Sequence, residues 1–261
     1  CALLPVRIGD AFISTGDILA EAVAFATGHQ AASMTLAVGG MLTPDWLGEV
    51  FANAWDNQLM IVAAAGDETS LHRNFPAVDP HALFVHTIGP DTDDWEDASS
   101  FLRFVNCNNF GPRMDLVSVS KNACATGSVA FIAGAAALIQ SAAVDHLGER
   151  ISSAQLYRVL TQTATDIDVA ESRGVDADPE LFPSYPGWDQ YFGYGRVDVG
   201  LAVEEVLAGA QGPAAKITSP DWFSFFARRS FDEDGREFGS VDSVAVHGEI
   251  EARPDQNWSY R

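Results

Sequence analysis

Basic residues are scarce in this sequence. Its 261 residues include 15 Lys and Arg against 36 Asp and Glu, and the formal net charge is −21. Nucleic acids and anionic membranes are bound through clustered Lys and Arg. The shortage therefore predicts that neither nucleic acid nor membrane is a partner. An acidic surface favours solubility and does not by itself name a substrate.

Long apolar runs and metal motifs are also missing. The longest apolar run, Val129 to Ile139, is shorter than the roughly 18 to 20 residues of a membrane span, and its small residues predict a buried helix. HExxH is absent and no pair of His residues has the spacing of a zinc site. We expect no cofactor and no metal, and the sequence leaves calcium open.

The beginning of the chain lacks both a Met and a signal peptide. The first residues, Cys1 to Arg7, already have the pattern of a buried strand, which favours a fragment whose N-terminus lies upstream. The 3 Cys leave one without a partner in the chain, which also suits a fragment. With 47% hydrophobic residues, the chain can nevertheless bury a substantial core.

Apolar runs alternate with amphipathic stretches over the first 207 residues. The expected strands are Cys1–Ile8, Ser33–Val38, Leu59–Ala65, Ala82–Ile88 and Met114–Val119, and the expected helices start at Asp17 and Pro44 and cover 128–147, 153–164 and 198–207. This alternation predicts an α/β fold, a parallel sheet with helices on both faces. The small residues of 128–147 predict that this helix runs through the centre.

The pattern changes near residue 212. Gln211 to Pro213 has the composition of a linker, and residues 168–190 have that of an exposed loop. From Val244 to Ala252 apolar and polar residues alternate, as in a half-buried strand. We therefore predict two parts, 1–210 and 211–261, the second being a linker and the start of a β-rich, immunoglobulin-like domain.

Three segments, in this order, resemble motifs of the subtilisin-like serine proteases. Ile61–Asp67, followed by Asn74–Ala77, resembles a strand ending in AAGN and then yPA. Cys124–Leu138 resembles the nucleophile segment GTSxAxxxVAGaaAL, and Tyr191–Val203 resembles the glycine-rich end of the catalytic domain. With Leu3–Gly9 and Ser33–Leu36, the resemblance covers about residues 3 to 207. It implies a subtilisin-like three-layer fold and a secreted bacterial serine endopeptidase acting on peptides or proteins.

The resemblance places Asp67 where subtilases have an Asn that donates a hydrogen bond to the oxyanion. An ionised carboxylate cannot donate and would repel an oxyanion. The position therefore works only if Asp67 is protonated or another group takes over its role. The alternative interpretation of Asp67 is a loop carboxylate or a helix N-cap.

The register of the nucleophile segment leaves two hydroxyls open. Counting back from Gly134 without gaps puts Thr126 at the nucleophile position, whereas the Gly127-Ser128 pair requires a deletion of two residues. We favour Ser128 as the nucleophile and keep Thr126 as the alternative, because the extra methyl group of Thr crowds the attack. Both hydroxyls could instead cap a helix.

In subtilases the catalytic Asp and His precede the segment that Leu3–Gly9 resembles, so neither has a counterpart here. Among the 6 His we expect His72 alone near the cleft, and we interpret the others, His29, His81, His86, His146 and His247, as structural or surface residues. The chain alone is therefore expected to hydrolyse no peptide bond at a useful rate. The alternative function is a catalytically dead, peptide-binding module.

The resemblance also implies two further features. The strand from Ser33 resembles the edge that pairs with extended substrate, and Thr35, Leu36 and Ala37 are its expected contact positions. Cys107 and Cys124 lie where a divergent bacterial branch of the family has a cysteine pair. A disulfide is therefore expected between them, the alternative being two free thiols, one of them buried under the helix, while Cys1 is expected to be free or paired upstream.

Overall fold

The computed structural model describes residues 2–9, 14–40, 44–72, 74–90, 96–98, 101–105, 107–121, 124–167, 184, 187–209, 226–227, 230–231 and 237–238. Its helices are α1 (Gly16–Gly28), α2 (Asp45–Asp56), α3 (Thr126–Leu147), α4 (Ser153–Gln162) and α5 (Val199–Leu207). Its strands are β1 (Ser33–Leu36), β2 (Met60–Ala64), β3 (Leu71–His72), β4 (Ala82–Gly89), β5 (Arg103–Phe104), β6 (Leu116–Val119), β7 (Phe226–Ala227), β8 (Ser230–Phe231) and β9 (Glu237–Phe238).

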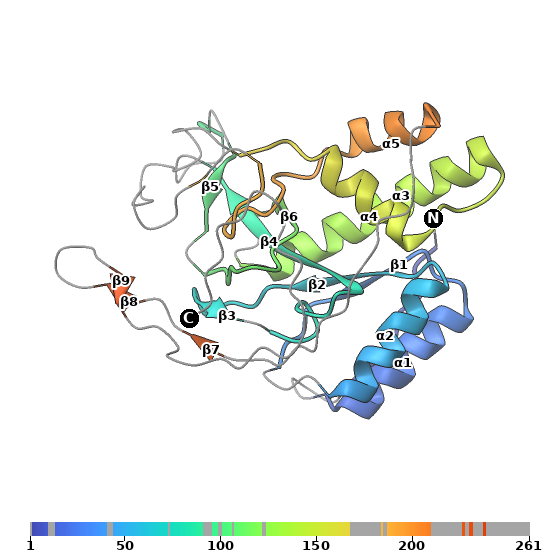
Figure 1. Cartoon of the computed structure of the whole chain (residues 1–261), viewed down its shortest axis with the longest axis horizontal. Coiled ribbons are helices and arrows are strands. Elements are labelled where there is room, and N and C mark those ends of the chain that lie inside the picture. Colours follow the sequence, from blue (N-terminus) through green and yellow to red (C-terminus); the bar gives the residue numbers. More distant parts are fainter. Residues whose placement is uncertain are drawn as a thin grey trace.

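A mainly parallel sheet forms the centre of the fold (Figure 1). Strands β1, β2, β4 and β6 pair in that order, all parallel, and the short β5 pairs antiparallel with the end of β4. Every residue of β2 and β4 is buried. Parallel strands covered on both faces consist of continuous apolar runs, which is why these two were predicted from the sequence.

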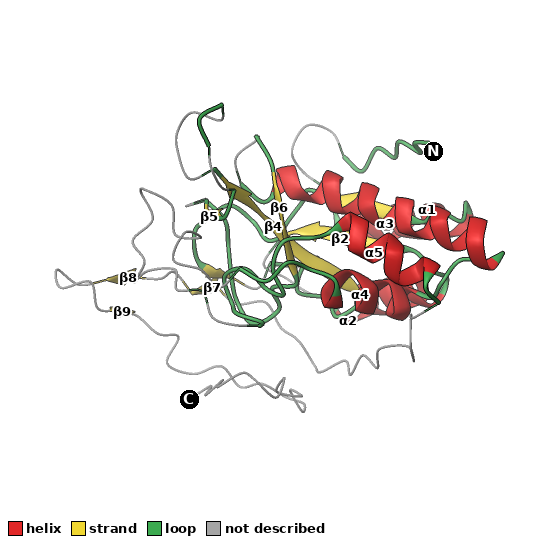
Figure 2. Cartoon of the chain, turned by 90° about the horizontal axis from the view of Figure 1, so that it is seen from above, coloured by secondary structure: helices red, strands yellow, loops and turns green. Residues whose placement is uncertain are grey.

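Helices cover both faces of the sheet. Helix α3 packs across β1, β2, β4 and β6, and α5 packs on α3 (Figures 1 and 2). Helix α2 packs on the opposite face against β2, with α1 beside it. The predicted α/β class with helices on both faces is confirmed. The prediction that α3 runs through the centre is wrong, because it lies on one face of the sheet and its Phe131 and Leu138 are 51% and 54% exposed.

Small residues let α3 lie close to the sheet. Ala133, Ala135 and Ala136 are buried, and Ser33 Oγ donates to the carbonyl of Ala133 at 2.7 Å. The helix ends at Gly148, whose φ of 83° is the left-handed conformation that glycine adopts most readily. By length and composition α3 is also apolar enough to cross a membrane, but half of its most apolar window is buried inside the protein.

The glycine-rich segment after residue 190 has a packing role, as the sequence suggests. Gly193 and Gly195 have φ values of 63° and 110°. A Cβ on Gly193 would lie 2.3 Å from the Asp115 carbonyl oxygen, and one on Gly195 would lie 2.1 Å from that of Thr165. Only glycine fits such close approaches of backbone to backbone.

The prediction of a buried strand over Cys1–Ile8 is wrong for the described residues 2–9. They form no strand, and Leu3 is 96% exposed. No strand among the described residues pairs with this segment, so its apolar side chains have no sheet face on which to pack. Pro5 also lacks the N–H that a strand needs.

The predicted second domain is largely beyond the described residues. The described part of 211–261 is limited to β7, β8 and β9, where β7 pairs antiparallel with β3 and β8 pairs with β9. The alternating stretch from Val244 to Ala252, the linker at 211–213 and most of the loop at 168–190 lie outside the described residues. The immunoglobulin-like domain therefore stays a prediction.

Candidate active site

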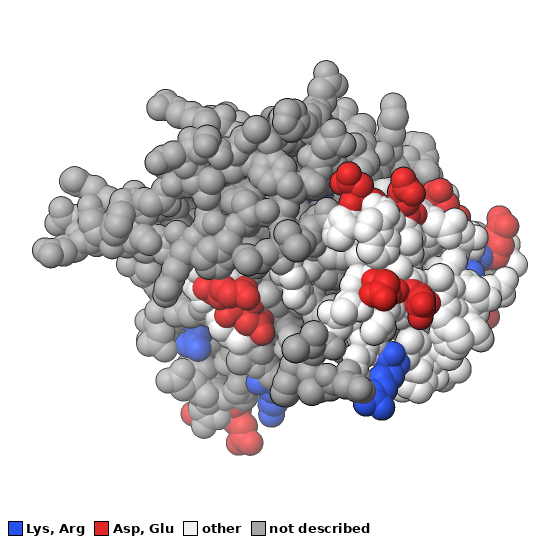
Figure 3. All heavy atoms as spheres, turned by 90° about the horizontal axis from the view of Figure 1, so that it is seen from below, with Lys and Arg blue, Asp and Glu red and all other residues white. Residues whose placement is uncertain are grey.

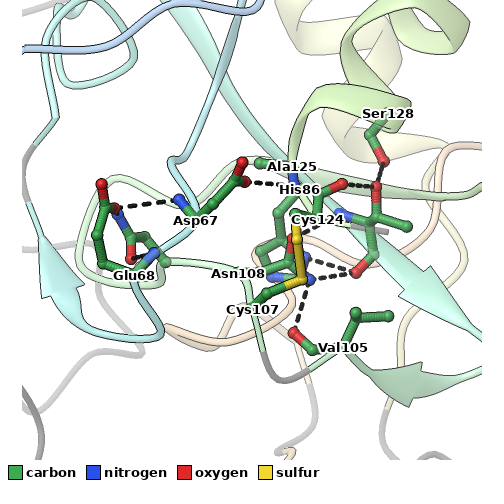
Figure 4. Close-up of a disulfide and its surroundings, with 11 residues drawn as sticks. Asp67, Glu68, His86, Val105, Cys107, Asn108, Cys124, Ala125 and Ser128 are labelled. Atoms are coloured by element: carbon green, nitrogen blue, oxygen red, sulfur yellow. Dashed lines mark hydrogen bonds between the residues drawn. A yellow bond between two sulfur atoms is a disulfide. The ribbon is translucent and has the colours of Figure 1, made fainter. Parts of the chain in front are cut away.

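The candidate site lies where the parallel strands end. Strand β2 continues into Gly66 and Asp67, and the chain after β6 leads through Cys124 into the first residue of α3, Thr126. In α/β folds, ligands bind outside the carboxyl ends of the strands. The sheet therefore brings Asp67 and the start of α3, about 58 residues apart in sequence, to one place (Figure 4).

The Asp67 carboxylate binds the start of α3 directly. Its Oδ1 accepts a hydrogen bond of 3.1 Å from the Ala125 N–H, one residue before Thr126. Partial burial raises the pKa of the Asp67 carboxyl; the Ala125 hydrogen bond opposes this shift, and the charge of Glu68 adds to it. The N-terminus of a helix favours negative charge. Asp67 thus holds the start of α3 through one of its carboxyl oxygens.

The two candidate hydroxyls lie in different environments. Ser128 is fully buried; its Oγ lies 2.9 Å from Thr87 Oγ1 and donates to the Ser118 carbonyl at 3.1 Å. Figure 4 shows the Ser128 side chain turned away from Asp67. Thr126, in contrast, is exposed. Thr126 is therefore open to solvent, whereas Ser128 is not.

Neither hydroxyl caps α3. The residue at its N-cap is Ala125, and no side chain makes a capping hydrogen bond there. The interpretation of Thr126 and Ser128 as helix caps is therefore wrong. The N-terminal N–H of Ala125 is satisfied instead by Asp67, from a loop that is distant in sequence.

A disulfide joins the loop before β6 to the segment before α3. Cys107 and Cys124 are bonded, with a Cα–Cα distance of 5.2 Å, which is the pairing that the resemblance implies. Cys124 lies two residues before Thr126, and its carbonyl accepts a hydrogen bond of 2.6 Å from Thr87 Oγ1. The bond therefore anchors the chain just before the exposed hydroxyl.

Among the described histidines, His86 is not suited to act as a base. It is fully buried in β4, with its ring nitrogens on the carbonyls of Thr87 and Tyr191. Burial lowers the pKa of His86 to about 4, although both hydrogen bonds act to raise it. The sequence predicts His72 in the loop after Asp67, whereas the structure has it in the short strand β3. Its side chain is outside the described part, so its expected place near the cleft stays a prediction.

We expect His86 to make the stability of the protein dependent on pH. The unfolded chain takes up this proton near the ordinary His pKa of about 6.5, whereas the folded chain does so near pH 4. Stability is thus complete above pH 6.5 and falls by about 3 kcal/mol as the pH drops to 4. Urea unfolding between pH 7 and 4 measures this. A His86→Asn variant should lose less stability over that range, and parallel curves for both proteins would contradict the assignment.

The strand expected to bind substrate, β1, lies at an edge of the sheet, and its role in substrate binding stays a prediction. Strand β1 pairs with β2 on one side, and within the described residues no strand pairs with its other edge. Thr35 and Ala37 are exposed, whereas the Leu36 side chain is buried in the core at 2% exposure. Side-chain contact with a peptide is therefore open to Thr35 and Ala37, and Leu36 can offer its backbone groups.

Two asparagines that the sequence did not single out as site residues border the site. Asn108 and Asn109 are fully buried, and their side chains bond to β4 and to the loop that carries Asp67. Buried Asn side chains generally have hydrogen-bond partners, but nothing in the sequence marks these two residues as buried.

Within the described part of the chain, charged side chains and possible metal ligands form no second site. Figure 3 shows one face on which acidic side chains are scattered with a few basic ones, without a continuous basic patch on the part described. Among the described residues, no group of three or more His, Cys, Asp or Glu could hold a metal ion.

Comparison with solved structures identifies the fold. The prenylagaramide maturation protease PagA matches with a TM-score of 0.59 and 18% identity, over 78% of this chain and 72% of that chain. A mutant of the PatA protease domain matches with a TM-score of 0.57 and 18% identity, over 77% of this chain and 68% of that chain. A lanthipeptide protease matches with a TM-score of 0.56 and 15% identity, over 77% of this chain and 69% of that chain. The chain has a subtilisin-like protease fold.

Sequence comparison adds no closer assignment. No protein-family model matches the chain, and neither does any curated protein. At 15 to 18% identity, the structural likeness shows the fold alone. The fold class predicted from the sequence is thus confirmed, and activity has to be argued from the residues of the site.

Proposed function

We propose that this chain forms part of a subtilisin-like peptidase, which hydrolyses peptide bonds by acyl transfer with Thr126 as the attacking hydroxyl. The observation that carries this proposal is the exposure of Thr126 at the start of α3, beside Asp67, while Ser128 is buried. The gapless count back from Gly134 supports the same residue. The preference for Ser128 drawn from the sequence is therefore given up in favour of Thr126.

The proposed reaction follows the order of other acyl-transfer hydrolases. A base takes the proton of Thr126 Oγ1, and the oxygen attacks the peptide carbonyl to form a tetrahedral intermediate. This intermediate collapses to an acyl-enzyme as the protonated amine leaves, and water then hydrolyses the ester. No described His ring is hydrogen-bonded to Thr126. The base must therefore come from beyond the described residues, and we keep the expectation that the chain alone is inactive.

The proposed substrate is an extended peptide. The neighbours' names, a prenylagaramide maturation protease and a lanthipeptide protease, connect this fold with the processing of peptides. The outer edge of β1 offers backbone groups to such a peptide, with Thr35 and Ala37 on its exposed side. The Cys107–Cys124 disulfide supports a secreted protein, since disulfides persist in oxidising compartments.

A second function, peptide binding without hydrolysis, is favoured by one observation. Asp67, at the position where subtilases have the Asn that donates to the oxyanion, accepts a hydrogen bond from the Ala125 N–H. As a carboxylate it cannot stabilise that oxyanion, which removes a major source of rate enhancement. Extended peptide could still pair with β1, because this pairing does not involve Asp67.

A Thr126→Ala variant separates the two functions. In the full-length protein that contains this chain, we expect the variant to lower kcat for peptide cleavage by about 10³-fold or more, because the nucleophile is lost. Peptide affinity should stay within about twofold. Cleavage is followed by mass spectrometry and binding by calorimetry. Binding without cleavage in the unmodified protein would establish the second function, and equal cleavage by the variant would exclude Thr126 as the nucleophile.

A further inference from the structure

Three consecutive residues, Cys107, Asn108 and Asn109, each bind a different segment that borders the candidate site. Cys107 is bonded to Cys124 ahead of α3. Asn108 binds the end of β4, and Asn109 binds the loop of residues 65–70 that carries Asp67. Figure 4 shows Cys107 and Asn108 beside the contact of Asp67 with Ala125. The tripeptide is thus bonded to both the Asp67 loop and the segment before α3.

Asn109 binds the Asp67 loop with both the oxygen and the nitrogen of its side-chain amide. Its Oδ1 accepts from the Glu68 N–H at 3.1 Å, the Ser70 N–H at 3.1 Å and Ser70 Oγ at 3.2 Å. Its Nδ2 donates to the Ala65 carbonyl at 3.1 Å and to Glu68 Oε2. A Cβ on Gly66, whose φ is 101°, would lie 2.4 Å from this Nδ2. The loop of residues 65–70 therefore packs closely around the side-chain amide of Asn109.

Asn108 reaches the first turn of α3 through Thr87. Its Nδ2 donates to the Thr87 carbonyl at 2.6 Å and to the Val105 carbonyl at 2.9 Å. The Thr87 hydroxyl donates in turn to the Cys124 carbonyl at 2.6 Å and lies 2.9 Å from Ser128 Oγ. Cys124 is thus held twice, by the disulfide and by Thr87, and Ser128 holds the helix from inside.

We propose that Cys107, Asn108 and Asn109 form one positioning segment, which sets the placement of Asp67 relative to Thr126. The segment touches neither the scissile bond nor Thr126 itself. It acts by fixing the Asp67 loop on one side and the start of α3 on the other. Polar residues with several backbone partners are effective supports for a site, since removing them leaves buried groups unsatisfied. The inference rests on the proposed function of Thr126 for its effect on catalysis.

Asn109→Ala tests this segment, and Gln140→Ala is the matched control. Gln140 is also buried, and its amide binds the backbone of Ile151 far along α3 from the site, accepting from the N–H at 3.0 Å and donating to the carbonyl at 2.8 Å. Both variants remove a buried amide with backbone partners. They differ in whether those partners carry Asp67.

Hydrogen exchange provides the readout that does not depend on activity. In Asn109→Ala we expect the amides of Glu68 and Ser70 to exchange at least about tenfold faster, and the amide of Ala125 to exchange faster as well, because Asp67 no longer holds it. In Gln140→Ala these amides should be unchanged while that of Ile151 exchanges faster. Faster exchange at Glu68 and Ser70 with no change at Ala125 would overturn the proposed link between the Asp67 loop and the start of α3.

Kinetics then separates this inference from the proposed function. In the full-length protein, kcat of Asn109→Ala should fall by about 10 to 100-fold with KM within about threefold. Asp67 then no longer holds the Ala125 N–H, so Thr126 at the start of α3 is displaced, and misplacing a reacting group by about 1 Å costs up to this much. Gln140→Ala should keep kcat. Normal kcat in Asn109→Ala would overturn the positioning role while leaving Thr126 catalysis intact. Absence of cleavage by the unmodified protein would overturn the proposed function, and the exchange result would still decide the link.

Discussion

Replacing Asp67 by Asn is expected to raise kcat for peptide cleavage in the full-length protein by about 10² to 10³-fold. An Asn at this position keeps an oxygen that can accept the Ala125 N–H, as the carboxylate does at 3.1 Å. It adds an amide N–H that can donate to the developing oxyanion, and it removes the negative charge. A single oxyanion donor contributes about this range of rate in other acyl-transfer hydrolases. The measurement is kcat and KM on one peptide substrate.

The control for this change is Asp67→Ala, which removes the charge without adding a donor. It should not raise kcat, because it also removes the acceptor that holds the Ala125 N–H at the start of α3. The pH dependence provides a further check, because burial raises the pKa of Asp67 above its ordinary value. As the pH falls through that pKa, Asp67 gains a proton and can donate, so the rate advantage of Asp67→Asn over the unmodified protein should shrink. A rate ratio near one at neutral pH would exclude Asp67 from the oxyanion position.

Removing the disulfide is expected to be the largest effect on stability. The bond between Cys107 and Cys124, at a sequence separation of 17, closes a loop of about 18 residues. In the chain-entropy model this contributes about 3 kcal/mol. The double variant Cys107→Ser, Cys124→Ser should therefore lower Tm by about 6 to 12 °C for a domain of this size. Calorimetry on the chain itself measures the shift.

Two controls make the disulfide result specific. Cys1→Ser removes the thiol that is not in this pair and should leave Tm unchanged. Reducing the unmodified chain with dithiothreitol should lower Tm by about as much as the double variant. A double variant that melts within about 2 °C of the unmodified chain would show that the bond contributes little to the folded state.

The fold could be predicted because its central strands are buried on both faces. Such strands are continuous apolar runs, and β2 and β4 have no exposed residue. Helix α3 was found from its small residues for a related reason, since they let it approach the sheet. The segment Cys1–Ile8 has the same apolar composition but no partner strand within the described part. An apolar composition shows that a segment could form a buried strand. It does not show whether a partner strand lies next to that segment.

The choice between Thr126 and Ser128 depends on the rotation of α3. Residues two apart on a helix differ by about 200°, so one of them faces the sheet when the other faces away. Ser128 falls on the buried stripe with Ile132, Ala136 and Ile139, at intervals of four, four and three residues. This periodicity was present in the sequence and favours Thr126 as the exposed hydroxyl, although motif matching alone left the register open.

The contacts of the positioning segment could not be predicted from the sequence for a different reason. The partners of Asn108 and Asn109 are mostly backbone groups, and the Thr87 and Ala65 carbonyls among them lie 21 and 44 residues earlier in the chain. Backbone donors and acceptors are the same for nearly every residue type, so they leave no pattern in the sequence. Such contacts follow from the sheet, which brings the ends of β2 and β4 together.

Covalent labelling tests the central claim most directly. The full-length protein is treated with a fluorophosphonate, and the modified residue is located by mass spectrometry of its peptides, with Thr126→Ala and Ser128→Ala in parallel. The account predicts an adduct on Thr126 that persists in Ser128→Ala and disappears in Thr126→Ala, because the Thr126 hydroxyl is exposed and that of Ser128 is buried. An adduct on Ser128, or no adduct on Thr126 in a protein that cleaves peptides, would contradict it.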